Sequence, residues 1–202
     1  MNQAGRRPAP CSSQSAEPEQ MIGRLLGYGV CLSLFGLVTA AQGWAWHANA
    51  TYRLNMTPSM PVGLWAVSRR PPAQLTRGSI VAICLPMSIG IPARERGYVT
   101  GGECPGQTMP MLKTIAAVPG DIVAISTRGL SVNGVLLAHS QALGRDSKGR
   151  PLTGMAIGTY SVRQSVFWLY AGHDPRSFDS RYYGGLPGKN VIGYAWPLLV
   201  LQ

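Results

Sequence analysis

Ser59 lies between two prolines in the stretch Asn55-Met56-Thr57-Pro58-Ser59-Met60-Pro61, just after the one long apolar segment of the sequence. Pro58 fixes its own backbone φ angle, and Pro61 restricts the residue before it, so Ser59 is predicted to lie on a stiff, non-helical turn. A hydroxyl that has lost its conformational freedom before substrate arrives suits a nucleophile. Serine and proline are also common in ordinary surface turns, which is the competing interpretation.

Lys113 lies in the otherwise apolar segment 111–118, which predicts a β-strand. A lysine in such a strand either reaches the surface or is buried and partly neutral. Burial lowers the pKa of a lysine, and an amine that is neutral near pH 7 is a competent general base. Because no histidine has a comparable setting, Ser59 with Lys113 is the best candidate pair of nucleophile and base. A single lysine in a strand is more often an edge or surface residue.

A third polar segment, residues 171–184, follows another predicted strand and contains Ser177, Asp179 and Arg181. It can be a turn network in which Asp179 pairs with Arg181. It can also supply the contacts that orient a lysine amine.

Composition favours many short strands over a helical bundle, because Gly (25) and Pro (16) are frequent and only 13% of the residues are charged. The 202 residues suffice for one domain of ordinary size plus an anchor. The net charge of +10 is not gathered into a dense basic run with interleaved aromatics, so nucleic acid is not an expected partner. Attraction to the anionic headgroups of a lipid bilayer explains the excess better.

An uncharged apolar run extends from Leu25 to Trp46, about the ~20 residues that cross a bilayer as a helix. Arginines precede the run, and the positive-inside rule then places the N-terminus in the cytoplasm. These features predict a cytoplasmic tail (1–24), one transmembrane anchor (25–46) and an exported domain (47–202). Ala48-Asn49-Ala50 also resembles a signal-peptide cleavage site, but the run is longer than a usual signal-peptide core.

Short apolar segments separated by turn residues predict a mainly β exported domain. Strands are expected at 63–67, 78–85, 111–118, 122–125, 130–132, 135–137, 165–170 and 191–195. Asn133-Gly134 is the strongest hairpin signal in the sequence. Residues 86–110, rich in Pro and Gly, are predicted to form a loop, and residues 139–154 a polar excursion on the surface.

Cys84 and Cys104 bracket the predicted loop on the exported side, where disulfides persist. A bridge between them would contribute ~3 kcal/mol to stability. Cys11 and Cys31 fall in the predicted tail and anchor and have no obvious partner. The three histidines show no ligand spacing, so we expect no metal and no cofactor.

Three segments, in order, resemble the signature boxes of type I signal peptidases: 57–61, the Lys113 strand running into 118–121, and 177–181. One branch, the TraF-type conjugative transfer peptidases, is similar over more segments. These are 61–65, 95–98, the Cys84/Cys104 pair, 139–140, 149–152 and 177–183. The resemblance covers roughly residues 45–202. It implies a signal-peptidase/LexA-like β fold preceded by one N-terminal transmembrane helix, with a Ser/Lys dyad.

The resemblance also implies roles for individual residues. Ser59 would be the nucleophile and Lys113 the general base. The Ser59 backbone N–H and the Thr57 hydroxyl would form the oxyanion hole, while Ser177, Asp179 and Arg181 would support the lysine. The third box opens with Gly172-His173-Asp174-Pro175 in place of Gly-Asp-Asn-Arg. This departure would affect substrate choice, and we assign His173 no catalytic role.

We therefore expect a single-pass protein of the inner (cytoplasmic) membrane whose periplasmic serine endopeptidase domain processes exported preproteins. By similarity to the TraF branch, a propilin is the expected substrate. Water would resolve the acyl-enzyme to a cleaved product and an amine to a cyclised one, and the sequence leaves both open.

The alternative from another class is a non-catalytic, membrane-anchored docking component of a conjugation or type IV secretion apparatus. It predicts that Ser59→Ala and Lys113→Ala retain function. A cytosolic Ser/Lys autoprotease fused to a repressor is disfavoured, because residues 1–54 hold the anchor where a helix-turn-helix would be needed.

Overall fold

The computed structural model describes residues 18–201, and the chain divides into two units, Met1–Ala48 and Asn49–Gln202. Within the first unit, helix α1 (Pro18–Ala48) begins at a proline, a residue well suited to a first helical position. The helix includes the predicted anchor, 25–46, and begins within the predicted tail. No helix in the part of the chain that the structure describes is long and apolar enough to cross a membrane. Cys11 lies outside the described residues.

The second unit is built on a seven-stranded antiparallel sheet with the order β1-β2-β12-β3-β5-β10-β11. Its strands are β1 (Ala50–Asn55), β2 (Gly63–Ser68), β12 (Val191–Val200), β3 (Ile80–Ile83), β5 (Met111–Ala117), β10 (Val166–Tyr170) and β11 (Leu186–Pro187). Strand β5, which carries Lys113, therefore lies between β3 and β10 and not at an edge. The prediction of a mainly β domain is confirmed.

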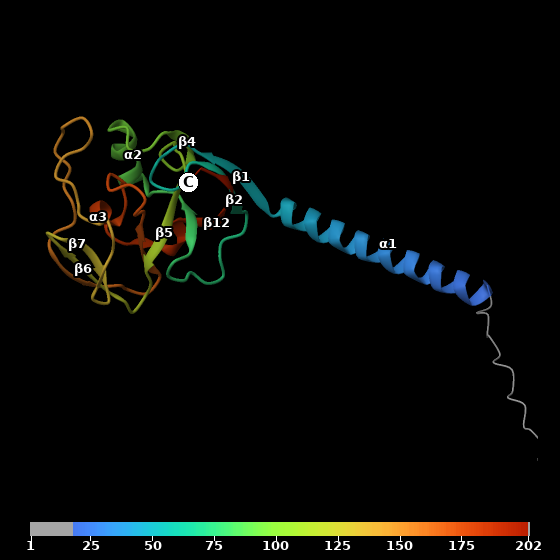
Figure 1. Ribbon diagram of the computed structural model, residues 1–202. Coiled ribbons are helices and arrows are strands. Elements are labelled where there is room, and N and C mark those ends of the chain that lie inside the picture. The colour runs from blue at the N-terminus through green and yellow to red at the C-terminus, as the bar shows by residue number, and fades with distance from the viewer. Residues whose placement is uncertain (1–17, 202) are drawn as a thin grey trace, which may run out of the picture. The chain divides into compact units, whose positions relative to one another are not determined.

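A second, four-stranded sheet has the order β8-β7-β6-β9. It comprises β8 (Val135–Leu136), β7 (Gly129–Val132), β6 (Ile122–Ser126) and β9 (Gly158–Ser161). The predicted hairpin is present, since Asn133 and Gly134 both have positive φ (49° and 84°), as a type I′ turn requires. In Figure 1, β6 and β7 lie at the opposite end of the domain from β1 and β2.

The core consists of three apolar clusters. The largest contains Ile83, Ile115 and Leu169 from the centre of the large sheet. A second contains Trp65 and Val67 of β2, and the third packs beneath the small sheet. The Lys113 strand contributes to all three, so its position is fixed from both faces.

The prediction of a loop over residues 86–110 is wrong, because this segment forms helix α2 (Met87–Glu95) and strand β4 (Gly101–Cys104). Pro92 lies inside α2 and removes one of its hydrogen bonds, so packing and not propensity maintains this helix. A Cβ on Gly90 would lie 3.3 Å from the Thr108 side chain, so glycine allows α2 to pack closely. The predicted disulfide between Cys84 and Cys104 is present, with the two Cα atoms 5.4 Å apart.

Two shorter helical elements, α3 (Ser180–Tyr183) and the 3₁₀ helix η1 (Gly188–Asn190), follow β10. Strands β1, β9 and β11 were not predicted, and β12 runs five residues beyond the predicted 191–195. Strand β1 escapes prediction because its residues follow the apolar run directly, without an intervening turn signal.

Candidate active site

Lys113 is among the most deeply buried side chains of the described domain, with 1% of its surface exposed. Its strand, β5, pairs with β3 on one side, where Lys113 is opposite Val81, and with β10 on the other. Burial lowers the pKa of the Lys113 amine from its usual 10.5 to about 8. Asp179 and Asp174 oppose this shift and Arg181 adds to it, so the amine is partly neutral near neutral pH.

Asp179 and Arg181 form a buried ion pair, the turn network that the sequence allowed. Their side chains are 0% and 1% exposed. One carboxylate oxygen of Asp179 accepts from the Arg181 Nε at 2.8 Å, and the other accepts from Nη2 at 2.9 Å. The backbone N–H groups of Arg181 and Ala171 complete the carboxylate's partners. Asp179 is therefore occupied by Arg181 and acts on Lys113 through its charge.

Arg181 also joins segments that are distant in the chain. Its Nη1 donates to the carbonyl oxygens of His139, Gln141 and Pro175, and its Nη2 donates to that of Ser177. The guanidinium thus holds residues 139–141 against the loop that follows β10.

Ser177 is buried, and within the described residues its Oγ has no hydrogen-bond partner. A buried hydroxyl without a partner is uncommon and calls for an explanation. Its predicted role, a contact with the Lys113 amine, would supply such a partner and stays a prediction.

The Ser59 turn is organised by the side chain of Asn55, at the end of β1. The Asn55 amide group donates to the carbonyl oxygens of Thr57, Met60 and Pro61, at 2.9 to 3.1 Å. Its Oδ1 accepts from the Thr57 backbone N–H at 3.2 Å, which closes an Asx turn. The Asn55 side chain therefore fixes the backbone both before Ser59, at Thr57, and after it, at Met60 and Pro61.

Ser59 is half-buried, and its Oγ lies 3.1 Å from the hydroxyl of Thr57. The Thr57 hydroxyl also donates to Asn55 Oδ1 at 2.8 Å. Because a hydroxyl has one proton, Thr57 can donate to an oxyanion only by releasing Asn55. The Ser59 backbone N–H has no such competitor in the part of the chain that the structure describes.

The structure brings the three predicted segments to one region. Met60, which follows Ser59, packs in one cluster with Leu112, which precedes Lys113, and with Ala171. The third segment also contacts the serine turn directly, because His173 Nδ1 lies 2.9 Å from the carbonyl oxygen of Pro58. Among residues 18–201, no hydrogen bond joins Ser59 to Lys113. Catalytic hydrogen bonds often tighten only when substrate binds.

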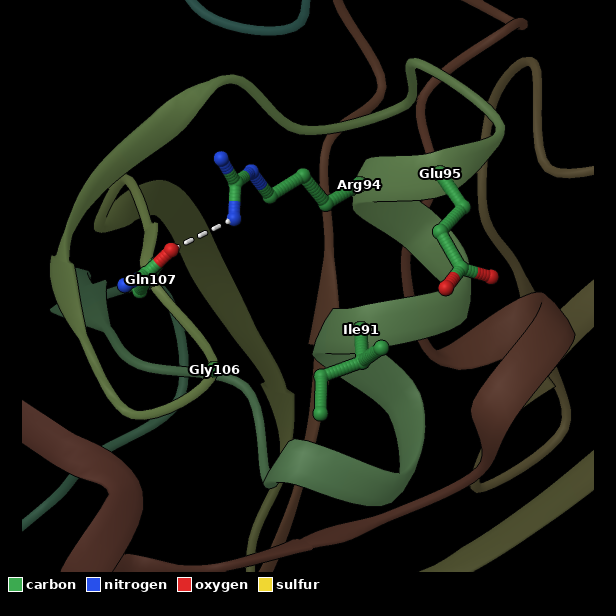
Figure 2. Close-up of a pocket in the computed structure, with 5 residues that line it drawn as sticks. All are labelled: Ile91, Arg94, Glu95, Gly106 and Gln107. Carbon is green, nitrogen blue, oxygen red and sulfur yellow. Dashed lines mark hydrogen bonds between the residues drawn. The ribbon is translucent and has the colours of Figure 1, made fainter.

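A separate pocket of about 420 Å³ lies between α2 and the loop after β4. Figure 2 shows Arg94 and Glu95 projecting from the helix, with Arg94 hydrogen-bonded to Gln107 across the pocket at 3.0 Å. Neither Ser59 nor Lys113 lines it. Within the described residues, no group of three or more His, Cys, Asp or Glu could hold a metal ion.

Sequence reasoning missed two residues of this site, Asn55 and His173. For Asn55 a signal was present, because an Asn two residues before a Thr-Pro turn can form an Asx turn. For His173 the only signal was the departure of 172–175 from the usual signal peptidase box.

Comparison with known proteins identifies the class. Residues 25–199 match the family model described as "Signal peptidase, peptidase S26", so the chain belongs to the S26 signal peptidase family of serine peptidases. Within it, the chain is 37% identical over 166 residues to the plasmid transfer protein TraF of Escherichia coli, covering 81% of this chain and 90% of that protein.

It is also 35% identical over 182 residues to a probable conjugal transfer protein TraF of Sinorhizobium fredii, covering 87% and 92% of the two chains. Among solved structures, a signal peptidase I from Enterococcus faecalis matches with a TM-score of 0.34 and 20% identity, over 60% of this chain and 96% of that one. The family-model match and the two TraF relatives confirm the predicted family and its TraF branch.

Proposed function

We propose that this chain is a membrane-anchored serine endopeptidase of the signal peptidase type that processes exported preproteins through a Ser59 acyl-enzyme. The observation that carries this proposal is Lys113, buried to 1% exposure on a central strand with its pKa lowered to about 8. Burying a lysine lowers the stability of the folded domain. In a family of serine peptidases a buried, partly neutral lysine can serve as the general base, which explains why it is buried.

In the proposed reaction the Ser59 oxygen bonds to the scissile carbonyl carbon while neutral Lys113 takes the hydroxyl proton. The Ser59 N–H and the Thr57 hydroxyl donate to the oxyanion that forms, each worth roughly 3 kcal/mol in comparable sites. The C–N bond then breaks, Lys113 protonates the leaving amine, and an ester to Ser59 remains. Ser177 would hold the lysine amine in place, because its buried hydroxyl has no partner among residues 18–201. Asp179 and Arg181 would hold the surrounding loop.

The substrate we propose is a conjugative propilin, because relatives of this chain are named plasmid or conjugal transfer proteins. The proposed anchor rests on the sequence, in which the run 25–46 carries no charge and arginines precede it. It would hold the enzyme in the inner membrane with its N-terminus in the cytoplasm and the catalytic domain in the periplasm. The Cys84–Cys104 disulfide suits an oxidising compartment.

The fate of the acyl-enzyme defines two possible products. If water attacks the ester, the product is a truncated acid that contains the added water. If the N-terminal amine of the substrate attacks instead, a new amide closes a ring, and the product is lighter by one water.

The test is the intact mass of a propilin after incubation with the full chain in detergent, beside the Ser59→Ala variant. A truncated acid indicates a processing peptidase, and the same product less one water indicates a cyclase. Substrate that stays unchanged, or that Ser59→Ala cuts equally well, would contradict the proposal. The non-catalytic docking component would then be the better hypothesis.

A further inference from the structure

The contact between His173 and Pro58 joins residues 115 positions apart in the chain. A carbonyl oxygen accepts hydrogen bonds and cannot donate them, so His173 Nδ1 must carry the proton in this 2.9 Å contact. Pro58 directly precedes Ser59, and its carbonyl belongs to the same peptide unit as the Ser59 N–H.

That peptide unit is rigid. A trans peptide is planar and directs its carbonyl oxygen and its N–H to opposite sides, and no cis peptide bond occurs among the described residues. Holding the Pro58 oxygen on the His173 side therefore directs the Ser59 N–H away from His173. This N–H makes no hydrogen bond within residues 18–201, so it remains available to an incoming oxygen.

The Asn55 side chain bonds three other carbonyl groups of the turn but does not reach this one. Asn55 bonds the carbonyls of Thr57, Met60 and Pro61, and the Pro58 carbonyl between them is bonded by His173. The peptide that supplies the proposed oxyanion donor is thus held from a different segment.

His173 is itself connected to the buried part of the site. His139 Nδ1 lies 3.1 Å from the carbonyl oxygen of Gly172, and the carbonyl of His139 accepts from Arg181 at 3.0 Å. Hydrogen bonds therefore link the Asp179–Arg181 pair, through His139 and the 172–173 backbone, to the peptide that precedes Ser59.

We propose that His173 is a positioning residue that orients the Pro58–Ser59 peptide, so that the Ser59 N–H points at the oxyanion of the tetrahedral intermediate. This inference rests on the proposed peptidase function and adds a role that the resemblance did not assign. In this role His173 acts on the reaction through the peptide that it bonds.

The role predicts an effect in the transition state and little effect in the ground state. Removing one oxyanion donor costs about 10²–10³-fold in kcat, and loss of orientation is a milder form of that loss. We expect His173→Ala to lower kcat about 10- to 100-fold with KM nearly unchanged.

Two further variants separate peptide orientation from general loop stability. The amide nitrogen of Asn lies as many bonds from the backbone as His Nδ1 does, so His173→Asn should restore most of kcat. His173→Gln places its amide nitrogen one bond further out and should not. Because His173 is exposed, all three variants should unfold at nearly the wild-type temperature.

The experiment measures propilin cleavage by the full-length chain in detergent. It also measures binding of an Ala-Ala-Ala peptide aldehyde and of the matching peptide alcohol, since small residues mark the cleavage sites of exported preproteins. The aldehyde carbon bonds to the Ser59 oxygen and leaves an oxyanion-like oxygen, whereas the alcohol binds without a new bond. The alanine variant should lose aldehyde affinity in parallel with kcat and keep its affinity for the alcohol.

If His173→Ala keeps the wild-type kcat, the positioning role is overturned. It is also overturned if all three variants lose affinity for the aldehyde and for the alcohol equally. If the wild-type chain itself leaves the propilin uncut and does not bind the aldehyde, the peptidase function fails, and this inference fails with it. An active wild type with an unaffected His173→Ala removes only the inference about His173.

Discussion

Lys113 and Ser59 lie in regions of opposite character. Lys113 is buried on a central strand, and its amine is surrounded by groups from elements far apart in the chain. Ser59 is half-buried on a turn whose shape comes mainly from Asn55, four residues away, with His173 as the distant contact. The properties of the proposed base therefore depend on the whole domain, and those of the proposed nucleophile depend on a few local hydrogen bonds.

This difference predicts that damage to the two regions will have different signatures. Changes near Lys113 should alter stability and pH dependence together with activity. Changes in the Ser59 turn should alter activity while the pH dependence stays the same.

Lys113→Met should give the largest effect and the clearest separation of activity from stability. Loss of the proposed base lowers kcat about 10²–10⁴-fold. Stability should rise, because a pKa lowered from 10.5 to about 8 corresponds to about 3 kcal/mol, at about 1.4 kcal/mol for each unit of pKa. Propilin cleavage and denaturant unfolding at pH 7 measure the two effects.

The gain in stability expected for Lys113→Met over the wild type should also depend on pH. Below about pH 8 the buried Lys113 amine of the folded wild type is charged, so the wild type loses the full stability that this burial costs. Between about pH 8 and 10.5 the unfolded lysine binds a proton that the folded one does not, so wild-type stability rises with pH. The advantage of Lys113→Met should therefore shrink across this window. Lys189→Met, at an exposed lysine, is the matched control and should change neither quantity.

Asp179→Asn should cost about 3–5 kcal/mol of stability, because it leaves the Arg181 guanidinium buried at 1% exposure without its counter-charge. The matched control is Glu103→Gln, which breaks an ion pair with Arg53 in which Glu103 is 56% exposed. That change should cost less than about 1 kcal/mol. Equal losses in chemical denaturation would mean that the Lys113 region does not depend on its buried pair.

Activity should rise with pH through about 8, the pKa of Lys113. Below that value each pH unit gives roughly tenfold more neutral amine, and kcat/KM of the free enzyme should follow it until it levels off. Asp174, Asp179 and Arg181 are the charged groups that act on this amine, so changes at these residues should move the midpoint. A flat profile between pH 6 and 8 would exclude Lys113 as the base.

The sequence predicts those features of the fold and the site that a few neighbouring residues determine, and it does not predict those that depend on contacts between distant segments. The Asn133-Gly134 hairpin and the Lys113 strand follow from patterns of a few residues, and both are present. Helix α2 was missed because Gly90 and Pro92 are unfavourable in a helix, and the packing that compensates involves Thr108, which lies outside the helix in the segment after β4.

The burial of Lys113 could not be decided from its own segment for a similar reason. Whether a strand lysine is exposed depends on which strands pair beside it, and β3 and β10 come from distant parts of the sequence. The contact of His173 with Pro58 is of the same kind. Asn55, in contrast, acts within six residues and was predictable in principle from its spacing.

Asn55→Ala is the smallest of these perturbations and the most direct test of the comparison. It removes the side chain that bonds three carbonyls of the turn, and we expect a loss of about 1–2 kcal/mol in stability and roughly tenfold in kcat. Asn55→Asp should be no better, because it keeps the acceptor for Thr57 but sets a carboxylate oxygen against those carbonyls.

The informative quantity in the Asn55 variants is the midpoint of the pH profile. Asn55 is not among the groups that shift the Lys113 pKa, so kcat/KM should fall at every pH while the midpoint stays at about 8. A shifted midpoint would mean that the serine turn helps to set the burial of the lysine, and the two regions would then have to be treated as one unit. An unchanged midpoint with lower activity would show that the turn positions the nucleophile independently of the base.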